Sequence, residues 1–223
     1  MTERLLHLIE KYPLNLVSHL SSGLPIILGL IFIKDLPRGF KLLLLLFALY
    51  FISDSYSLWL SVKQKSTYPI QNIQPLFEIW IAAAIYLSFI KKTSSRKWIF
   101  CGLLICSLII VLSYKTDAIS TPGTTTQRLF IATIALAYFN KILTDARIKY
   151  ILLDGMFWVS AGLLIFSAGT FFFWLFSSYL FSATSSDREF IAFWYFNQIL
   201  YMIFCLMSCF GIYVNKYNSE NLI

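Results

Sequence analysis

One carboxylate within an apolar run is the residue of this sequence best placed to do chemistry. Asp54 lies centrally in the run Leu42–Val62, and Tyr50, Ser57 and Ser61 share its helical spacing. A charge in the middle of a membrane costs at least about 2.5–3.5 kcal/mol on insertion scales, so an ionisable residue there marks a candidate functional site. Asp54 could line a cavity, relay a proton or hold a ligand. The structural alternative is that it only hydrogen-bonds a neighbouring helix.

Other polar residues within apolar runs could join Asp54 in a pocket. Glu78 lies near the start of the third run, close to the expected outer interface, where it could instead extend to water. Pro25 should bend the first run and open space around its hydroxyls. The remaining candidates are Ser22, Asn140, Asn197 and Tyr201. Because hydrogen bonds between membrane helices average under ~1 kcal/mol, a purely structural cluster is the alternative to a functional pocket.

The sixth apolar run contains a short repeat of small residues. Ser160-Ala161-Gly162 recurs seven residues later as Ser167-Ala168-Gly169, which places both triplets on one helix face. Small residues allow helix backbones to approach closely. We expect Ser160, Gly162, Ser167 and Gly169 to pack against a helix of the same bundle. A homodimer interface, or a sliding surface that carries a signal, is the alternative.

Several kinds of catalytic chemistry lack their residues. The chain has only two histidines, His7 and His19, so a membrane zinc hydrolase is not expected. The last apolar run has no mid-helix lysine for a retinal Schiff base, and no phosphate-binding loop motif occurs. The cysteines lie within apolar runs, where they behave as small apolar residues: Cys101, Cys106, Cys205 and Cys209. We therefore expect no metal site, no cofactor and no enzyme.

Seven apolar segments must position these residues. A bilayer core of roughly 30 Å needs about 20 apolar residues per helix. The expected spans are Leu14–Ile33, Leu42–Val62, Pro75–Ile90, Trp98–Tyr114, Leu129–Leu143, Gly155–Phe181 and Phe190–Val214. The sequence therefore predicts an all-α integral membrane protein, a bundle of seven transmembrane helices.

Basic residues orient this bundle, since Lys and Arg near helix ends favour the cytoplasmic side. The first, third and fifth loops hold Lys34, Arg38, Lys41, Lys91, Lys92, Arg96, Lys97, Lys141, Arg147 and Lys149. The other loops hold fewer: Lys63, Lys65, Lys115, Arg128 and Arg188. This asymmetry predicts an outside N-terminus and a cytoplasmic C-terminus, although Arg4 and Lys11 before the first span oppose it.

Composition agrees with a single membrane domain over residues 1–223. Apolar residues make up 58% of the chain and charged residues 13%, against roughly 25% charged in soluble domains. Residues 1–12 should form a short amphipathic helix on the outer surface, and 215–223 a short cytoplasmic tail. We assign the net charge of +7 to topology and anionic lipid headgroups rather than to nucleic acid.

A family resemblance lies in the last third of the chain, mainly in residues 155–214. Residues 157–170 (FWVSAGLLIFSAGT), followed by the helix that contains 193–198 (FWYFNQ), resemble bacterial seven-helix membrane proteins that occur beside, or fused to, sensor histidine kinases. The resemblance implies a sensory module of the bacterial inner membrane, and it carries over no ligand-binding residues. Because only nine residues follow the last span, we expect no kinase domain in this chain.

The leading hypothesis is thus a membrane sensor or signalling subunit. Its polar pocket would read a ligand or a membrane state, and its cytoplasmic loops would inform a separate protein partner, a signalling kinase or a larger membrane complex. One alternative is a small transporter or channel subunit with Asp54 as a proton or cation site. The other is a structural subunit whose polar residues serve only packing.

Overall fold

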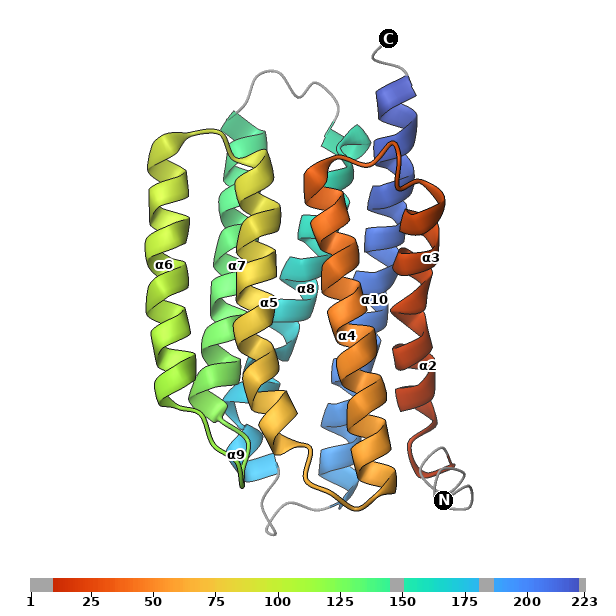
Figure 1. The fold of residues 1–223 in the computed structure, drawn as a ribbon, viewed down its shortest axis with the longest axis vertical. Coiled ribbons are helices and arrows are strands. Elements are labelled where there is room, and N and C mark those ends of the chain that lie inside the picture. The colour runs from red at the N-terminus through yellow and green to blue at the C-terminus, as the bar shows by residue number, and fades with distance from the viewer. Residues whose placement is uncertain (1–9, 145–150, 181–186, 221–223) are drawn as a thin grey trace.

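Long helices, running side by side in alternating directions, make up the structure (Figure 1). The computed structural model describes residues 10–144, 151–180 and 187–220, and these residues include no strand. The helices are α2 (Pro13–Ser21), α3 (Gly23–Ile31), α4 (Arg38–Val62), α5 (Tyr68–Phe89), α6 (Thr93–Leu112), α7 (Thr121–Thr144), η1 (Ile151–Leu153), α8 (Gly155–Leu175), α9 (Ser177–Leu180) and α10 (Asp187–Glu220).

Five helical segments of the described chain are long and apolar enough to cross a membrane: 13–31, α4, α6, α8 and 188–217 within α10. The prediction of an all-helical protein with several apolar helices is therefore confirmed. Helices α5 and α7 have 22 and 24 residues, so they are as long as the others but less apolar. These two helices carry Glu78, Gln127 and Arg128, which the bundle buries.

Helix boundaries differ from the expected spans where proline or polar residues intervene. The first segment breaks at Ser22, because Pro25 lacks the N–H that would bond to the Ser21 carbonyl. Helix α5 begins at Tyr68 and contains Pro75, with which the span was expected to begin. Helix α7 begins at Thr121, so the prediction that Arg128 lies in a loop was wrong: it is buried within the helix.

The predictions for the chain ends have mixed outcomes. Residues 1–9 of the expected surface helix lie outside the described residues; of residues 10–12, Glu10 and Lys11 are helical. At the other end, α10 continues to Glu220, so most of the segment that was expected to be a tail extends the last helix.

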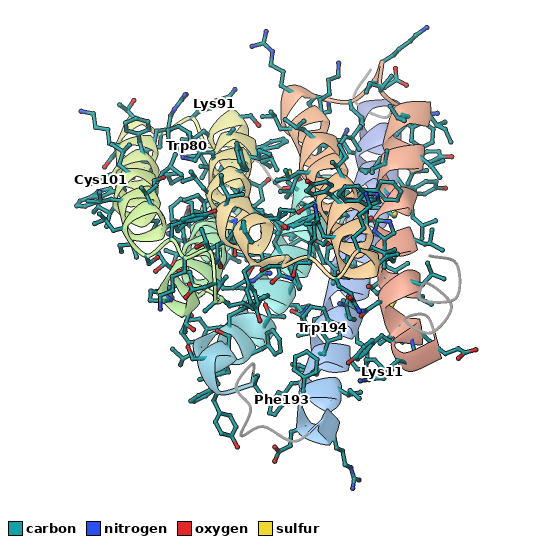
Figure 2. All side chains as sticks on the ribbon, turned by 60° about the horizontal axis from the view of Figure 1, so that its bottom comes forward. Lys11, Trp80, Lys91, Cys101, Phe193 and Trp194 are labelled. Carbon is teal, nitrogen blue, oxygen red and sulfur yellow. The ribbon has the colours of Figure 1, made fainter. Side chains whose placement is uncertain are left out.

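The two ends of the bundle differ in their number of basic residues. The connections 32–37 and 90–92 and the C-terminal end of α10 lie at one end, which we call the basic end (Figure 1). Among the residues that the structure describes, it carries Lys34, Arg38, Lys41, Lys91, Lys92, Arg96, Lys97, Lys141 and Lys216. The opposite end carries Lys11, Lys63, Lys65, Lys115 and Arg188. Figure 2 shows Lys91 and Lys11 at these opposite ends.

Apolar side chains fill the bundle and also cover much of its outside. The interior is densest toward the basic end, where Phe40, Leu43, Tyr86 and Met156 are fully buried. On the outside, exposed apolar residues follow the helices: Ile27, Ile31, Phe100, Leu104, Leu108, Leu112, Leu129 and Leu136 among them. Exposed apolar surface on this scale is typical of contact with lipid.

Candidate functional site

A cavity of about 340 Å³ lies among six helices, in the half of the bundle opposite the basic end. Helix α2 contributes Asn15 and His19, α4 contributes Tyr50, Asp54, Ser57 and Ser61, and α5 contributes Gln71, Gln74 and Glu78. Thr124, Gln127 and Arg128 come from α7, Phe166 and Trp174 from α8, and Trp194, Asn197, Gln198 and Tyr201 from α10. Polar groups from five helices thus meet an aromatic wall.

Glu78 is the central acid of this cavity, and it is 2% exposed. One carboxylate oxygen, Oε2, accepts hydrogen bonds from the Tyr50 hydroxyl at 2.9 Å and from the Gln127 side-chain amide. The other oxygen, Oε1, accepts from the Gln74 amide at 2.7 Å. Three neutral donors from α4, α5 and α7 therefore satisfy this carboxylate, as a buried acid requires. The structure does not place Glu78 in water, the alternative that its sequence position allowed.

Arg128, one residue after Gln127, supplies the positive charge opposite Glu78. It is 6% exposed and interacts electrostatically with the Glu78 carboxylate. Its guanidinium lies 4.3 Å from the centre of the Phe166 ring and 5.9 Å from that of Trp174. Its Nε and Nη1 atoms have no hydrogen-bond partner among the described residues. Arg128 is thus balanced in charge but poor in hydrogen-bond acceptors.

Asp54 sits at the rim of the cavity rather than in its depth, since 47% of its side chain is exposed. The carboxylate lies 4.0 Å from His19 Nδ1. The other ring nitrogen of His19, Nε2, is 3.2 Å from the Ser55 hydroxyl, and its ring stacks on Phe51 at 4.5 Å. Asp54 and His19 therefore form a loose pair between α2 and α4.

Helix α10 forms the remaining wall. The Trp194 indole donates a hydrogen bond of 2.5 Å to the Asn15 side chain, which ties α10 to α2. Figure 2 shows Trp194 lying between these helices, with Lys11 nearby. One turn further along, Asn197 is 8% exposed, and its Oδ1 has no partner within the described part of the chain.

Aromatic rings close the cavity toward the basic end. Phe204 stacks on Phe47 at 5.0 Å and on Phe166 at 5.9 Å. Tyr201 packs edge-on against Tyr50 at 5.5 Å. Phe47 and Phe204 are fully buried. None of the residues that line the cavity lies beyond this layer, so the cavity ends at about the middle of the bundle.

The structure brings most of the predicted pocket residues together. Asp54, Ser57, Glu78, Asn197 and Tyr201 all line the cavity. Ser22 is fully buried, and its hydroxyl donates to the His19 carbonyl at 2.6 Å, so it shapes the break between α2 and α3 outside the cavity lining. Asn140 is exposed near the opposite end of α7, away from the cavity.

The small residues of α8 contact other helices of the same chain. A Cβ on Gly162 would lie 3.1 Å from Phe204 and Met207, and one on Gly169 would lie 2.5 Å from Leu200, so both glycines allow α10 to approach. Ser160 accepts a hydrogen bond of 3.1 Å from Tyr86 on α5, and Ser167 is fully buried. The bundle itself therefore occupies the surface that was also considered for a dimer.

Among the cavity residues that were not identified from the sequence are His19, Gln74, Gln127 and Arg128. The signal for three of them was their spacing. Gln71, Gln74 and Glu78 recur at helical intervals before and after Pro75, and Gln127-Arg128 directly precedes an apolar run. Extending both helices toward their polar ends would have placed these side chains inside the bundle.

The side chains of the site can form hydrogen bonds with polar groups. They combine one buried acid, one buried cation, one acid at the rim and several amides with aromatic rings. Comparison with family models, curated proteins and solved structures finds no match to this chain.

Proposed function

We propose that this protein is a seven-helix sensor or signalling subunit of the bacterial inner membrane. A ligand would enter the cavity from the outside, and the resulting change in helix packing would reach a separate partner, a signalling kinase or larger complex, at the cytoplasmic basic end. The observation that carries the proposal is the position of the cavity: charged and amide side chains line it together with aromatic rings, it lies in the half opposite the basic end, and it ends at the Phe47–Phe204 layer. A pocket with one closed end suits reception better than conduction.

The seven spans would be α2 with α3, then α4, α5, α6, α7, α8 and α10. Helices α5 and α7 are included because, at about 1.5 Å per residue, their 22 and 24 residues reach roughly 33 and 36 Å. Their polar residues face the cavity, where intramembrane charges are tolerated because they pair inside the bundle. The excess of Lys and Arg at the basic end favours a cytoplasmic position for that end.

Helix α10 offers a direct connection between the two ends. It lines the cavity with Trp194, Asn197 and Tyr201 and continues to Lys216, whose ammonium lies 4.3 Å from the centre of the Phe32 ring at the basic end. Gly162 and Gly169 of α8 bring α10 into close backbone contact, so a shift of one helix alters the packing of the other. The signal can be no larger than the difference in ligand affinity between the two packing states.

The test combines partner capture with one variant at the rim. A tagged protein cross-linked in native membranes should co-purify with a signalling kinase or its complex. Asp54→Asn should change the output of that partner without changing the amount of folded protein. Asp117→Asn, which removes an exposed acid outside the cavity, is the matched control. The proposal fails if no signalling protein co-purifies and Asp54→Asn leaves every phenotype intact.

A small transporter is the second candidate, favoured by the His19–Asp54 pair. The two side chains lie 4.0 Å apart, and Asp and His within membrane helices are residue types that transporters use for proton relays. Gradient-dependent uptake in proteoliposomes that Asp54→Asn abolishes would favour transport. Uptake that is absent, together with an intact partner response, would favour sensing.

A further inference from the structure

Arg128 presents hydrogen-bond capacity that the protein does not use. A guanidinium stays protonated in proteins and carries five N–H donors in a planar fork. Arg128 is 6% exposed, lines the cavity, and leaves Nε and Nη1 without an acceptor among the described residues. Burying such donors unpaired is costly, so an acceptor that enters the cavity gains the full benefit of satisfying them.

Glu78 is not that acceptor, although it supplies the opposite charge. Its carboxylate already accepts from Tyr50, Gln74 and Gln127, and all three donors are neutral. Glu78 therefore offsets the charge of Arg128 without a direct ion pair, and Nε and Nη1 of the guanidinium keep no acceptor among the described residues. A planar group with two oxygens fits that fork best, because carboxylates bind Arg in the bidentate arrangement.

The rim of the same cavity presents the opposite chemistry. Asp54 has a half-exposed carboxylate, and the His19 imidazole lies 4.0 Å away. Asn197 Oδ1 and Gln71 Oε1 are buried acceptors that lack a donor among the residues described. These three groups can accept hydrogen bonds from an ammonium group.

Charge balance then restricts the ligand. An anion alone would add negative charge to a cavity that holds Asp54 and Glu78, whereas a cation alone would leave Arg128 unsatisfied. A molecule that carries both charges leaves the total unchanged and serves both groups. The volume of about 340 Å³ lies at the small end of ligand pockets, and the rings of Phe166, Trp174 and Trp194 offer contact to an apolar body.

We propose that the cavity binds a small zwitterion of the amino-acid class, whose carboxylate is held by Arg128 and whose ammonium group faces Asp54, Asn197 and Gln71. The apolar part of the ligand lies against the aromatic wall of α8 and α10. This proposal rests on the proposed role of the cavity as a ligand site and names the chemical class of that ligand.

The first experiment measures thermal unfolding of the purified protein in lipid nanodiscs with each standard L-amino acid, β-alanine and 4-aminobutyrate. At least one should raise the unfolding temperature in a saturable way. The strongest binder is then compared with its amide, which lacks the carboxylate, and with its desamino acid, which lacks the ammonium group. Each should bind at least about tenfold more weakly than the zwitterion. Absence of any stabilising amino acid, or equal binding of either analogue, overturns the proposal.

Variants assign the two ends of the ligand. Arg128→Lys keeps the charge but not the fork, and should weaken the zwitterion at least about tenfold while leaving the amide unchanged. Asp54→Asn should do the reverse, weakening the zwitterion but not the desamino acid. Lys115→Gln removes an exposed cation at the same end of the bundle and serves as the control, which should bind normally. If Arg128→Lys does not fold, the double variant Glu78→Gln/Arg128→Gln removes both charges and should show the same loss. Unchanged affinity in the folded Arg128 variant overturns the assignment.

This experiment separates the ligand class from the signalling role. Zwitterion binding without any effect on a partner would overturn the proposed function and leave the ligand class standing. A partner response that depends on Asp54, with no binding of any zwitterion, would do the opposite.

Discussion

The Tyr50 hydroxyl donates a hydrogen bond of 2.9 Å to the Glu78 carboxylate and joins α4 to α5 deep in the cavity. The Tyr50 ring also packs on Tyr201 of α10 at 5.5 Å. One side chain therefore connects the buried acid to the helix that runs from the cavity to the basic end. Any ligand that moves Glu78 or Tyr201 must also act on this contact.

Removing the Tyr50 hydroxyl should destabilise the protein moderately. Tyr50→Phe keeps the ring contacts but takes one of three donors from a buried carboxylate, and hydrogen bonds to charged groups contribute about 1.5–3 kcal/mol. We expect a loss of about 2 kcal/mol, measured by chemical unfolding in detergent micelles. Tyr56→Phe, at an exposed position of the same helix, is the control. Equal effects of the two substitutions would show that the hydrogen bond does not stabilise the fold.

Glu78 and Arg128 should behave as a coupled pair. Glu78→Gln removes the carboxylate that interacts electrostatically with the buried Arg128 guanidinium, so it should destabilise the protein. The loss should be smaller than the cost of about 3–5 kcal/mol for a broken direct ion pair, because no salt bridge joins the two groups. The double variant Glu78→Gln/Arg128→Gln leaves no unbalanced charge, so its stability should exceed that of Glu78→Gln alone. A double-mutant cycle by thermal unfolding measures the coupling. Additive losses would mean that the two charges act independently.

The contact between α8 and α10 should tolerate no added methyl group at its closest point. A Cβ on Gly211 would lie 2.5 Å from the Gly155 carbonyl oxygen, which is backbone and cannot rotate away. Gly211→Ala should therefore lower stability by about 1–3 kcal/mol, the usual cost of overpacking. Gly23→Ala is the matched control, because nothing lies within 4 Å of the added Cβ. The yield of folded protein and its unfolding temperature test the contrast.

The site was partly predictable because intramembrane polarity is conspicuous in the sequence. Asp54, Glu78, Asn197 and Tyr201 stand out against apolar neighbours, and all line the cavity. Their depths were not predictable, because depth depends on where each helix begins. With α5 starting at Tyr68, Glu78 lies about three turns into its helix instead of at an interface.

Arg128 was not identified as a cavity residue for the same reason, because the start of its helix was not predictable. An apolarity criterion ends a span at a charge, whereas a bundle can enclose a charge that meets an opposite one on another helix. Here Glu78 of α5 supplies the partner for Arg128 of α7, and neither helix shows this by itself. Because Arg128 lies in a helix, it no longer counts among the loop cations that were used to orient the protein. Of those cations, Lys63, Lys65, Lys115 and Arg188 remain at the cavity end, so the excess of Lys and Arg at the basic end is larger.

The proposed orientation makes a direct prediction about single exposed positions. In a variant whose native cysteines Cys101, Cys106, Cys205 and Cys209 are replaced by alanine, Lys65→Cys should react with a membrane-impermeant maleimide in intact cells. Lys34→Cys and Lys91→Cys should react only after permeabilisation, because the positive-inside rule places the basic end in the cytoplasm. All three lysines are exposed, so differences in labelling report the side of the membrane. The Lys65–Lys91 pair also tests α5, the helix between them: labelling of both positions in intact cells would exclude α5 as a span. The reverse labelling pattern would mean that the basic end faces outward and that the cavity lies on the cytoplasmic side.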